Sequence, residues 1–144
     1  MAAYIKINDL AIDLLNGVHS GGHTYRYALS NTAPASESPN PTDTGNGQLA
    51  NVTQIAYTNL AEDRSISGIA AAQVGDDATL DGDQEVLTAT GGTVGPFRYV
   101  YAYNDTATGD PLIGAWDYGS SITLQDGETF TLSIPTVLLN LLQA

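Results

Sequence analysis

The sequence predicts a mainly β (α+β) domain, most simply a small antiparallel β-sandwich or barrel-like sheet with a helix lying on it. Apolar side chains recur at helical spacing only near the N-terminus and around residue 50, whereas beyond Arg64 they alternate along the chain. Gly, Asn, Asp and Pro gather between the alternating runs, where turns need them. With 144 residues the chain has the length of one ordinary domain, so we expect a single domain over residues 1–144.

Two helices are predicted in the first part of the chain. In INDLAIDLLNGVH the apolar residues follow one helical face, Asn8 or Asp9 can cap the start, and Gly17 can end it. The residues of this face are Ile7, Leu10, Ala11, Leu14, Leu15 and Val18. QLANVTQIAY, residues 48–57, fits a second, short helix, although its β-branched residues weaken that pattern.

A strand and a long arm separate these helices. In HTYRYALS the side chains of His23, Tyr25, Tyr27 and Leu29 alternate with smaller or more polar ones, which is typical of a half-buried strand. Residues 31–46 contain three prolines and almost nothing to bury, so we expect a Pro-rich loop or arm that is mobile unless a neighbouring segment covers it.

Beyond Arg64 we expect six short strands separated by turns. The predicted strands are residues 64–74, 85–92, 96–104, 111–119, 121–124 and 128–134. Residues 75–84 and 104–111 are rich in Gly, Asp and other turn formers and are predicted to be corners. QDG, residues 125–127, predicts a tight hairpin in which the glycine takes a positive φ.

Aromatic side chains concentrate in two of these strands. Strict alternation would place Phe97, Tyr99, Tyr101 and Tyr103 on one face, with Arg98, Val100, Ala102 and Asn104 on the other. Leu112, Trp116 and Tyr118 of the following strand would then stack beside the aromatic face. We favour core packing for this face over a ligand platform, because half-buried strands often carry aromatic residues for packing alone.

Composition and charge exclude several functions. Sixteen acidic residues stand against four basic ones, a formal net charge of −12, so no basic stripe is available for nucleic acid or an anionic membrane. No apolar run reaches the length of a membrane-spanning helix, and the first residues do not have the pattern of a secretory signal. The absence of cysteine excludes disulfides, thiol nucleophiles and Cys-ligated zinc.

No catalytic, cofactor or metal site is predicted. The acidic run DDATLDGDQE fails as a calcium loop, because counting from Asp77 puts threonines, Thr79 and Thr88, at the third and twelfth positions. His19 and His23 have a zinc-like spacing, but the intervening glycines break any helix and no third ligand lies nearby in sequence. The sequence contains no nucleophile elbow and no phosphate-binding glycine motif.

The C-terminal residues IPTVLLNLLQA are apolar and uncharged. Leucine and valine occupy most positions from Val137 to Leu142, so both faces of an extended segment would be apolar. Such a tail is either a central strand of the domain's own sheet or a surface that lies against another subunit, and we favour the first.

Two C-terminal blocks, GGTVGPFRYVYAYND and PLIGAWDYGSSITLQDGETFTL, together with the earlier YALSNTAP and LANVTQIA, resemble a family of small structural proteins that tailed bacteriophages encode near their head genes. The resemblance runs from the N-terminal helix to about residue 134. The chain departs from the family pattern at residues 59–83, where a more aromatic, Gly-rich stretch is replaced, and in its extra C-terminal leucines.

This resemblance implies a virion protein without enzymatic activity, and we expect a capsid decoration or cement protein. It would be made in the host cytoplasm, bind the major capsid protein on the outer surface of the head, and self-associate to match a capsid axis, for which a trimer would suit a threefold position. A head–tail connector or tail component is the alternative within this class. A carbohydrate- or receptor-binding module is the alternative from another class, with Trp116, Tyr118 and Tyr99 as an exposed stacking platform.

Overall fold

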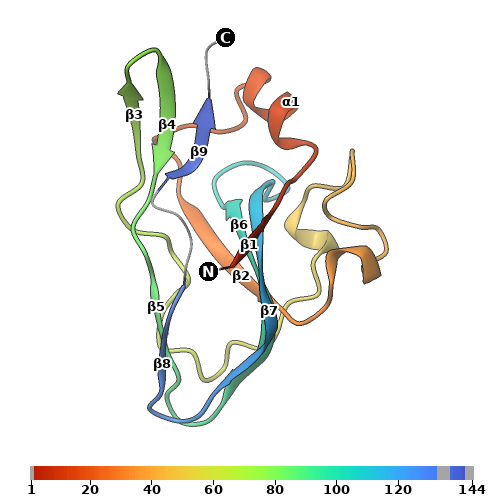
Figure 1. Cartoon of the computed structure of the whole chain (residues 1–144), viewed down its shortest axis with the longest axis vertical. Coiled ribbons are helices and arrows are strands. Elements are labelled where there is room, and N and C mark those ends of the chain that lie inside the picture. Colours follow the sequence, from red (N-terminus) through yellow and green to blue (C-terminus); the bar gives the residue numbers. More distant parts are fainter. Residues whose placement is uncertain (1, 133–136, 142–144) are drawn as a thin grey trace.

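The computed structural model describes residues 2–132 and 137–141 and confirms a mainly β architecture (Figure 1). Every strand pair is antiparallel. The sheets do not close into a barrel, so of the two predicted forms the sandwich-like one applies.

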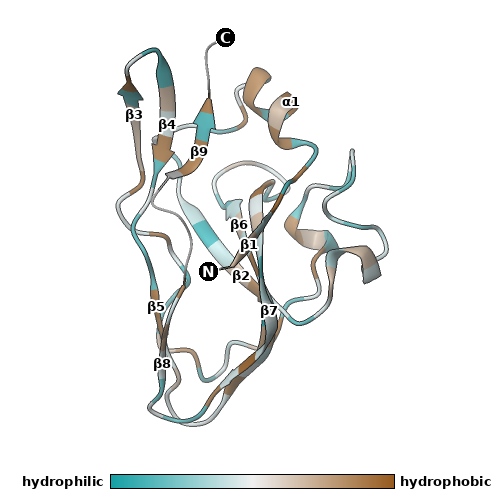
Figure 2. Cartoon of the chain, in the orientation of Figure 1, coloured by the Kyte–Doolittle hydropathy of each residue, from teal (hydrophilic) through white to brown (hydrophobic). Residues whose placement is uncertain are grey.

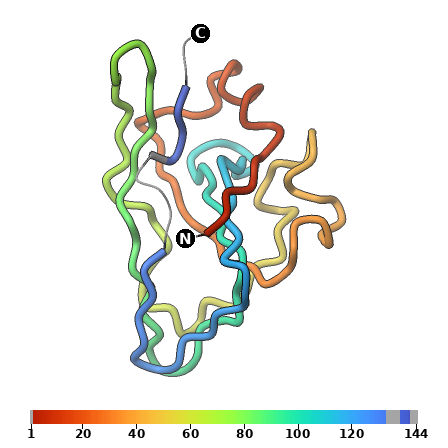
Figure 3. The backbone as a smooth tube through the Cα atoms, in the orientation of Figure 1, coloured from red at the N-terminus to blue at the C-terminus, as the bar shows by residue number. Residues whose placement is uncertain are grey.

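A four-stranded sheet forms the centre of the fold, in the order β1-β7-β6-β2. Its longest strands are β6 (Val94–Asn104) and β7 (Leu112–Leu124), flanked by β2 (Tyr25–Ser30) and by β1 (Ala3–Ile5), a strand that the sequence pattern did not predict. The hairpin of β6 and β7 runs much of the length of the molecule, as the tube in Figure 3 shows. Residues predicted as two strands, 111–119 and 121–124, are thus one continuous strand.

Two smaller sheets lie beside this hairpin (Figure 1). One has the order β3-β4-β9 and consists of β3 (Ala70–Val74), β4 (Asp77–Asp81) and β9 (Val137–Leu141). The other pairs β5 (Val86–Thr88) with β8 (Thr129–Thr131). The predicted hairpin at QDG joins β7 to β8, and Gly127 has the predicted positive φ, 84°.

The central sheet is covered on both faces. One face packs against the small sheets, and that cluster includes Tyr25, Leu29, Val100 and Trp116. The other face carries the tyrosines of β6. It packs against Ile7, which follows β1 in the chain, and against the segment around residue 50. Ring hydroxyls aside, both clusters are apolar, so hydrophobic burial on two sides fixes the position of the β6–β7 hairpin.

Tyr99, Tyr101 and Tyr103 share one face of β6 and are buried, which confirms the core interpretation of the aromatic stretch. Phe97 does not share this face, contrary to the prediction. The register between β6 and β7 shifts between Phe97 and Tyr99, and Phe97 packs in the other cluster, with Val100 and Ala102. A β-bulge adds one residue to a strand and so reverses the alternation beyond it, which a sequence pattern alone does not reveal.

Trp116 also lies on the opposite face from the one predicted. It is aligned with Val100 and packs in the cluster that faces the small sheets, whereas Leu112 lies with Tyr101 and Tyr103 as expected. A second register shift, between Ala102 and Tyr103, lies between the part of the hairpin that contains Trp116 and the part that contains Leu112. Tyr118 is half-buried and packs on the same side as Trp116.

The N-terminal helix is shorter than predicted. Helix α1 covers only Leu10–Leu15, and none of its residues is buried. Ile7, the first predicted helical position, is instead fully buried in the core before the helix begins. Asp9 occupies the N-cap position without capping the helix, because its carboxylate accepts hydrogen bonds from the arm instead.

The second predicted helix, at residues 48–57, is wrong. Only Leu49–Asn51 form a single 3₁₀ turn (η2), and Val52 is already extended, with φ −105° and ψ 123°. The β-branched Val52, Thr53 and Ile55 favour this extended path. The arm at residues 31–46 has a 3₁₀ turn at Pro34–Ser36 (η1) and folds back on the chain, since Asn8 N donates to Thr42 O at 3.1 Å.

The acidic stretch predicted as a corner contains a strand. Only the residues around Gly75, with φ 64°, make the turn, and Asp77–Asp81 form β4. Of the predicted strand at residues 64–74, the last five form β3. The C-terminal tail forms β9 in the chain's own sheet but at its edge, with Leu138 buried and Leu141 57% exposed; Leu142 lies outside the described residues.

Candidate interaction surface

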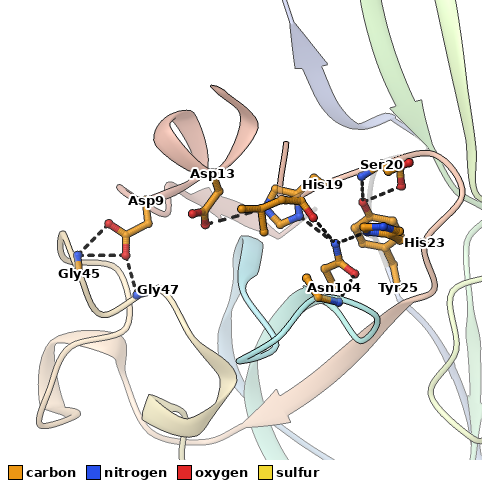
Figure 4. Close-up of polar contacts among 11 residues, drawn as sticks. Asp9, Asp13, His19, Ser20, His23, Tyr25, Gly45, Gly47 and Asn104 are labelled. Atoms are coloured by element: carbon orange, nitrogen blue, oxygen red, sulfur yellow. Dashed lines mark hydrogen bonds and ion pairs between the residues drawn. The ribbon is translucent and has the colours of Figure 1, made fainter. Parts of the chain in front are cut away.

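His19 and His23 come together around one buried amide (Figure 4). Asn104, at the end of β6, is fully buried, and its Nδ2 lies 3.2 Å from Nδ1 of His19 and 2.9 Å from Nδ1 of His23. The same Nδ2 lies 3.1 Å from Val18 O, so its two protons are shared among three acceptors. Asn104 Oδ1 accepts from the backbone N–H of Thr106 and of Ala107, which fixes the amide with its donors toward the rings.

This arrangement keeps His19 neutral. Its side chain is 1% exposed, and burial, followed by the neighbouring His23, lowers the pKa of His19 to about 4. Because Nδ1 accepts from Asn104, the neutral ring carries its proton on Nε2, which has no hydrogen-bond partner within the described residues. Asp13 Oδ2 is 3.9 Å from Nε2, beyond hydrogen-bonding distance.

The cluster holds the segment 18–23 against the end of β6. Tyr25 contributes to the same anchoring, since its hydroxyl donates to Ser20 O at 3.0 Å and accepts from Ser20 N at 3.1 Å. Residues 2–132 and 137–141 contain no group of three or more His, Asp or Glu side chains that could hold a metal ion. The contacts of both rings with the buried Asn104 amide give the histidines a positioning role in the fold.

The predicted stacking platform is not on the surface. Trp116 is 3% exposed and Tyr99 is 7% exposed. Tyr118, which is half-buried, meets Phe130 edge-on with ring centroids 5.3 Å apart. Rings buried in this way cannot stack on a sugar, so these three residues do not form the exposed surface that the carbohydrate-binding alternative requires.

An apolar face of the β3–β4–β9 sheet is partly open instead. Ala71, Ala78 and Leu141 are exposed on it, whereas Leu80 is buried in the core cluster. Ala71, Leu80 and Leu139 are aligned across the three strands, and so are Gln73, Ala78 and Leu141. Residues aligned across neighbouring strands point to the same face of a sheet. We call the face formed by these six residues, with the segments that border it, the β3–β4–β9 groove.

Two adjoining hollows follow this groove. One, of about 440 Å³, lies over Gln73, Ala78 and Leu141 and ends at Asp76, in the β3–β4 turn, and at Asp77, the first residue of β4. The other, of about 200 Å³, lies between Leu80 and Leu139 of the sheet and Leu14 and His19 on the far side. Ala71, Ala78 and Leu141 line both hollows, which makes them one continuous depression.

Helix α1 extends this apolar surface beyond the groove. Ile12 is 52% exposed and Leu15 is 84% exposed, on the element that also supplies Leu14 to the groove wall. Figure 2 shows apolar residues on α1 and on β9, which lie at the same end of the molecule. An exposed apolar surface of this kind is typical of a site that binds another protein.

Sequence reasoning found only part of this surface. The sequence indicates the C-terminal leucines and a strand that includes β3, but the acidic residues around Ala78 and Leu80 indicate a turn in place of β4. The signal that could have found them is the alternation of Asp77, Thr79 and Asp81 with Ala78 and Leu80, which is the pattern of a strand with one apolar face.

Comparison of the chain with models of protein families, with curated proteins and with solved structures found no match. Among the described residues, no helix is long and apolar enough to cross a membrane.

Proposed function

We propose that this chain is a non-enzymatic structural protein of a tailed-phage virion, and specifically a capsid decoration protein that binds the major capsid protein on the outside of the assembled head. The observation that carries the proposal is the resemblance of the blocks at residues 91–105 and 111–132 to small phage structural proteins. Such a protein stabilises the shell by binding its assembled form better than its free subunits.

The location of these blocks in the fold agrees with this proposal. They form β6, β7 and β8, and so supply the hairpin on which the rest of the chain packs. The segments that depart from the family pattern, residues 59–83 and the C-terminal leucines, supply β3, β4 and β9 instead. The resemblance thus covers the scaffold, and the departures meet in the β3–β4–β9 groove.

The charge of the chain suits the outer surface of a head. A net charge of −12 disfavours contact with packaged DNA and can steer the protein toward basic patches on a shell. Self-association would then match the symmetry of the site on the shell, as a trimer does at a threefold axis.

The test is cryo-electron microscopy of heads from the encoding phage, assembled without this chain and then mixed with the purified protein. We expect new density on the outside of the head at the junctions between capsomers, and heads that withstand higher temperature before releasing DNA. Heads that remain bare at saturating protein would overturn the decoration proposal. Density of the chain only at the neck or tail of complete virions would replace it with the connector or tail assignment.

A further inference from the structure

We propose that the β3–β4–β9 groove is a docking site for an extended segment of another protein that carries both leucine-like and basic side chains. The groove floor consists of Ala71, Ala78 and Leu80 with Leu139 and Leu141, which leaves an apolar surface wide enough for side chains rather than for water alone. Small alanines at its centre, beside the larger leucines, give it the depth that a branched apolar side chain would fill.

The free edge of β9 favours an extended partner. β9 pairs with β4 on one side, and within the described residues no strand pairs with its other side. Its residues 137–141 carry no charge, whereas exposed edge strands usually carry a charged residue that prevents pairing with other chains. A segment added along β9 would bond to its backbone and place alternate side chains beside Leu139 and Leu141, along the border of the groove.

The charges around the groove favour a basic partner. Asp76 lines its open end in the β3–β4 turn, and the whole chain has a net charge of −12. Opposite charges on the partner would speed the encounter and fix its direction in the groove, while acidic ones would be repelled.

A second copy of this chain is a poor source of those basic side chains. Arg26 pairs with Asp105 at 3.2 Å, Arg98 pairs with Asp117, and the Arg64 guanidinium lies 4.1 Å from the centre of the Tyr57 ring. Three of the four basic residues are therefore engaged within the chain itself. The groove consequently fits a partner other than a second copy of this chain. That this partner is the major capsid protein of the shell rests on the proposed function.

The groove is tested with two synthetic ten-residue peptides, one alternating Leu and Lys and one alternating Leu and Glu. We expect the Leu–Lys peptide to shift the backbone amide resonances of β3, β4 and β9 and the Leu–Glu peptide to bind at least tenfold more weakly. Leu141→Asp adds a charge on the groove face and should weaken Leu–Lys binding at least tenfold. Ala78→Gln should weaken it in the same way without adding charge.

Val74→Asp is the matched control. Val74 is 63% exposed in the same sheet, but the alternation of β3 places it on the face opposite Gln73 and Ala71. Its substitution should change peptide affinity less than twofold. Equal weakening by Val74→Asp, amide shifts confined to other strands, or equal binding of the two peptides would overturn the proposal. A wild-type dimer in sedimentation that Leu141→Asp dissociates would overturn it too, with a second copy as the occupant.

The same variants on undecorated heads separate this inference from the proposed function. If the wild-type protein binds heads and Leu141→Asp does not, the groove is the contact with the shell. If both bind equally, the chain decorates the head through another surface, and the shell is not the partner of the groove. If neither protein binds heads while the peptide results are as expected, the proposed function fails. The groove would then still be a docking site for a segment with apolar and basic side chains, but on another partner.

Discussion

At the scale of single residues, the most informative group is the imidazole of His19. Its pKa of about 4 in the folded protein lies below the ordinary value of 6.5, because burial disfavours the charged ring. Between these two values the unfolded chain binds more protons than the folded one, so stability is complete above about pH 6.5 and falls as the pH decreases toward 4. The largest loss from this group is on the order of 3 kcal/mol.

Urea denaturation of the wild type and of His19→Asn between pH 4 and pH 7 measures this effect. Asparagine keeps an acceptor near the position of Nδ1 and does not titrate, so the difference between the two curves isolates His19 from the carboxylates that also protonate in acid. We expect the wild type to lose more free energy of unfolding than the variant as the pH falls. Parallel curves, or an NMR titration of His19 near pH 6.5, would contradict the assignment.

The faces of individual aromatic residues show where sequence reasoning stops at this scale. Alternation correctly places Tyr99, Tyr101 and Tyr103 together in the core. It fails for Phe97 and Trp116, because each lies beyond a shift in register between β6 and β7. Such a shift depends on how the two strands pair, which is a property of the sheet and not of either strand's own pattern.

At the scale of elements, strands were easier to predict than helices. Strands β2, β6 and β7 alternate over many residues and bury one or both faces, so their pattern is strong. The helical patterns near residues 10 and 50 are short, and an isolated helix of that length has little stability of its own. Contacts with the rest of the chain therefore decide their length. Local patterns likewise indicate single strands of the candidate groove, but they do not show that β3, β4 and β9 come together.

The arm at residues 31–46 illustrates such a contact. The Asp9 carboxylate accepts hydrogen bonds from Gly45 N at 2.8 Å and 3.0 Å and from Gly47 N at 2.9 Å (Figure 4). Asp9→Ala removes the acceptor of both N–H groups. Water can replace it at the exposed Gly45 but not at the buried Gly47, so we expect a local loss of about 1–3 kcal/mol. Hydrogen exchange at the Gly45 and Gly47 amides should become at least about tenfold faster.

Asp43→Ala is the control for this prediction. Asp43 is an exposed acidic residue of the same arm, and the hydrogen bonds to Asp9 come from the backbone of Gly45 and Gly47, not from Asp43. Its removal should leave exchange at Gly45 and Gly47 unchanged. If Asp9→Ala also left that exchange unchanged, other contacts, such as the bond from Asn8 N to Thr42 O, would be sufficient to hold the arm.

At the scale of the whole molecule, the fold class follows from composition and alternation, whereas the arrangement of the sheets does not. The pairing of β4 with β9 joins residues far apart in sequence, and the pairing of β5 with β8 does the same. Nothing in a local pattern specifies such partners, because strands of similar composition are interchangeable until the core selects among them. The acidic balance of the chain, in contrast, can be read directly from the sequence, and it has a measurable consequence.

Sixteen acidic residues against four basic ones make the folded chain repel itself. Salt screens this repulsion, so we expect the Tm at pH 7 to rise by about 3–5 °C between 10 and 300 mM NaCl, roughly 1 kcal/mol. Replacing the exposed Asp43 and Asp76 by Asn changes the net charge from −12 to −10 and should raise the Tm in low salt while reducing the response. The pair Asp43→Glu and Asp76→Glu keeps the charge and should behave as the wild type. A Tm that falls with salt in scanning calorimetry would mean that specific ion pairs, such as Arg98 with Asp117, outweigh the general repulsion.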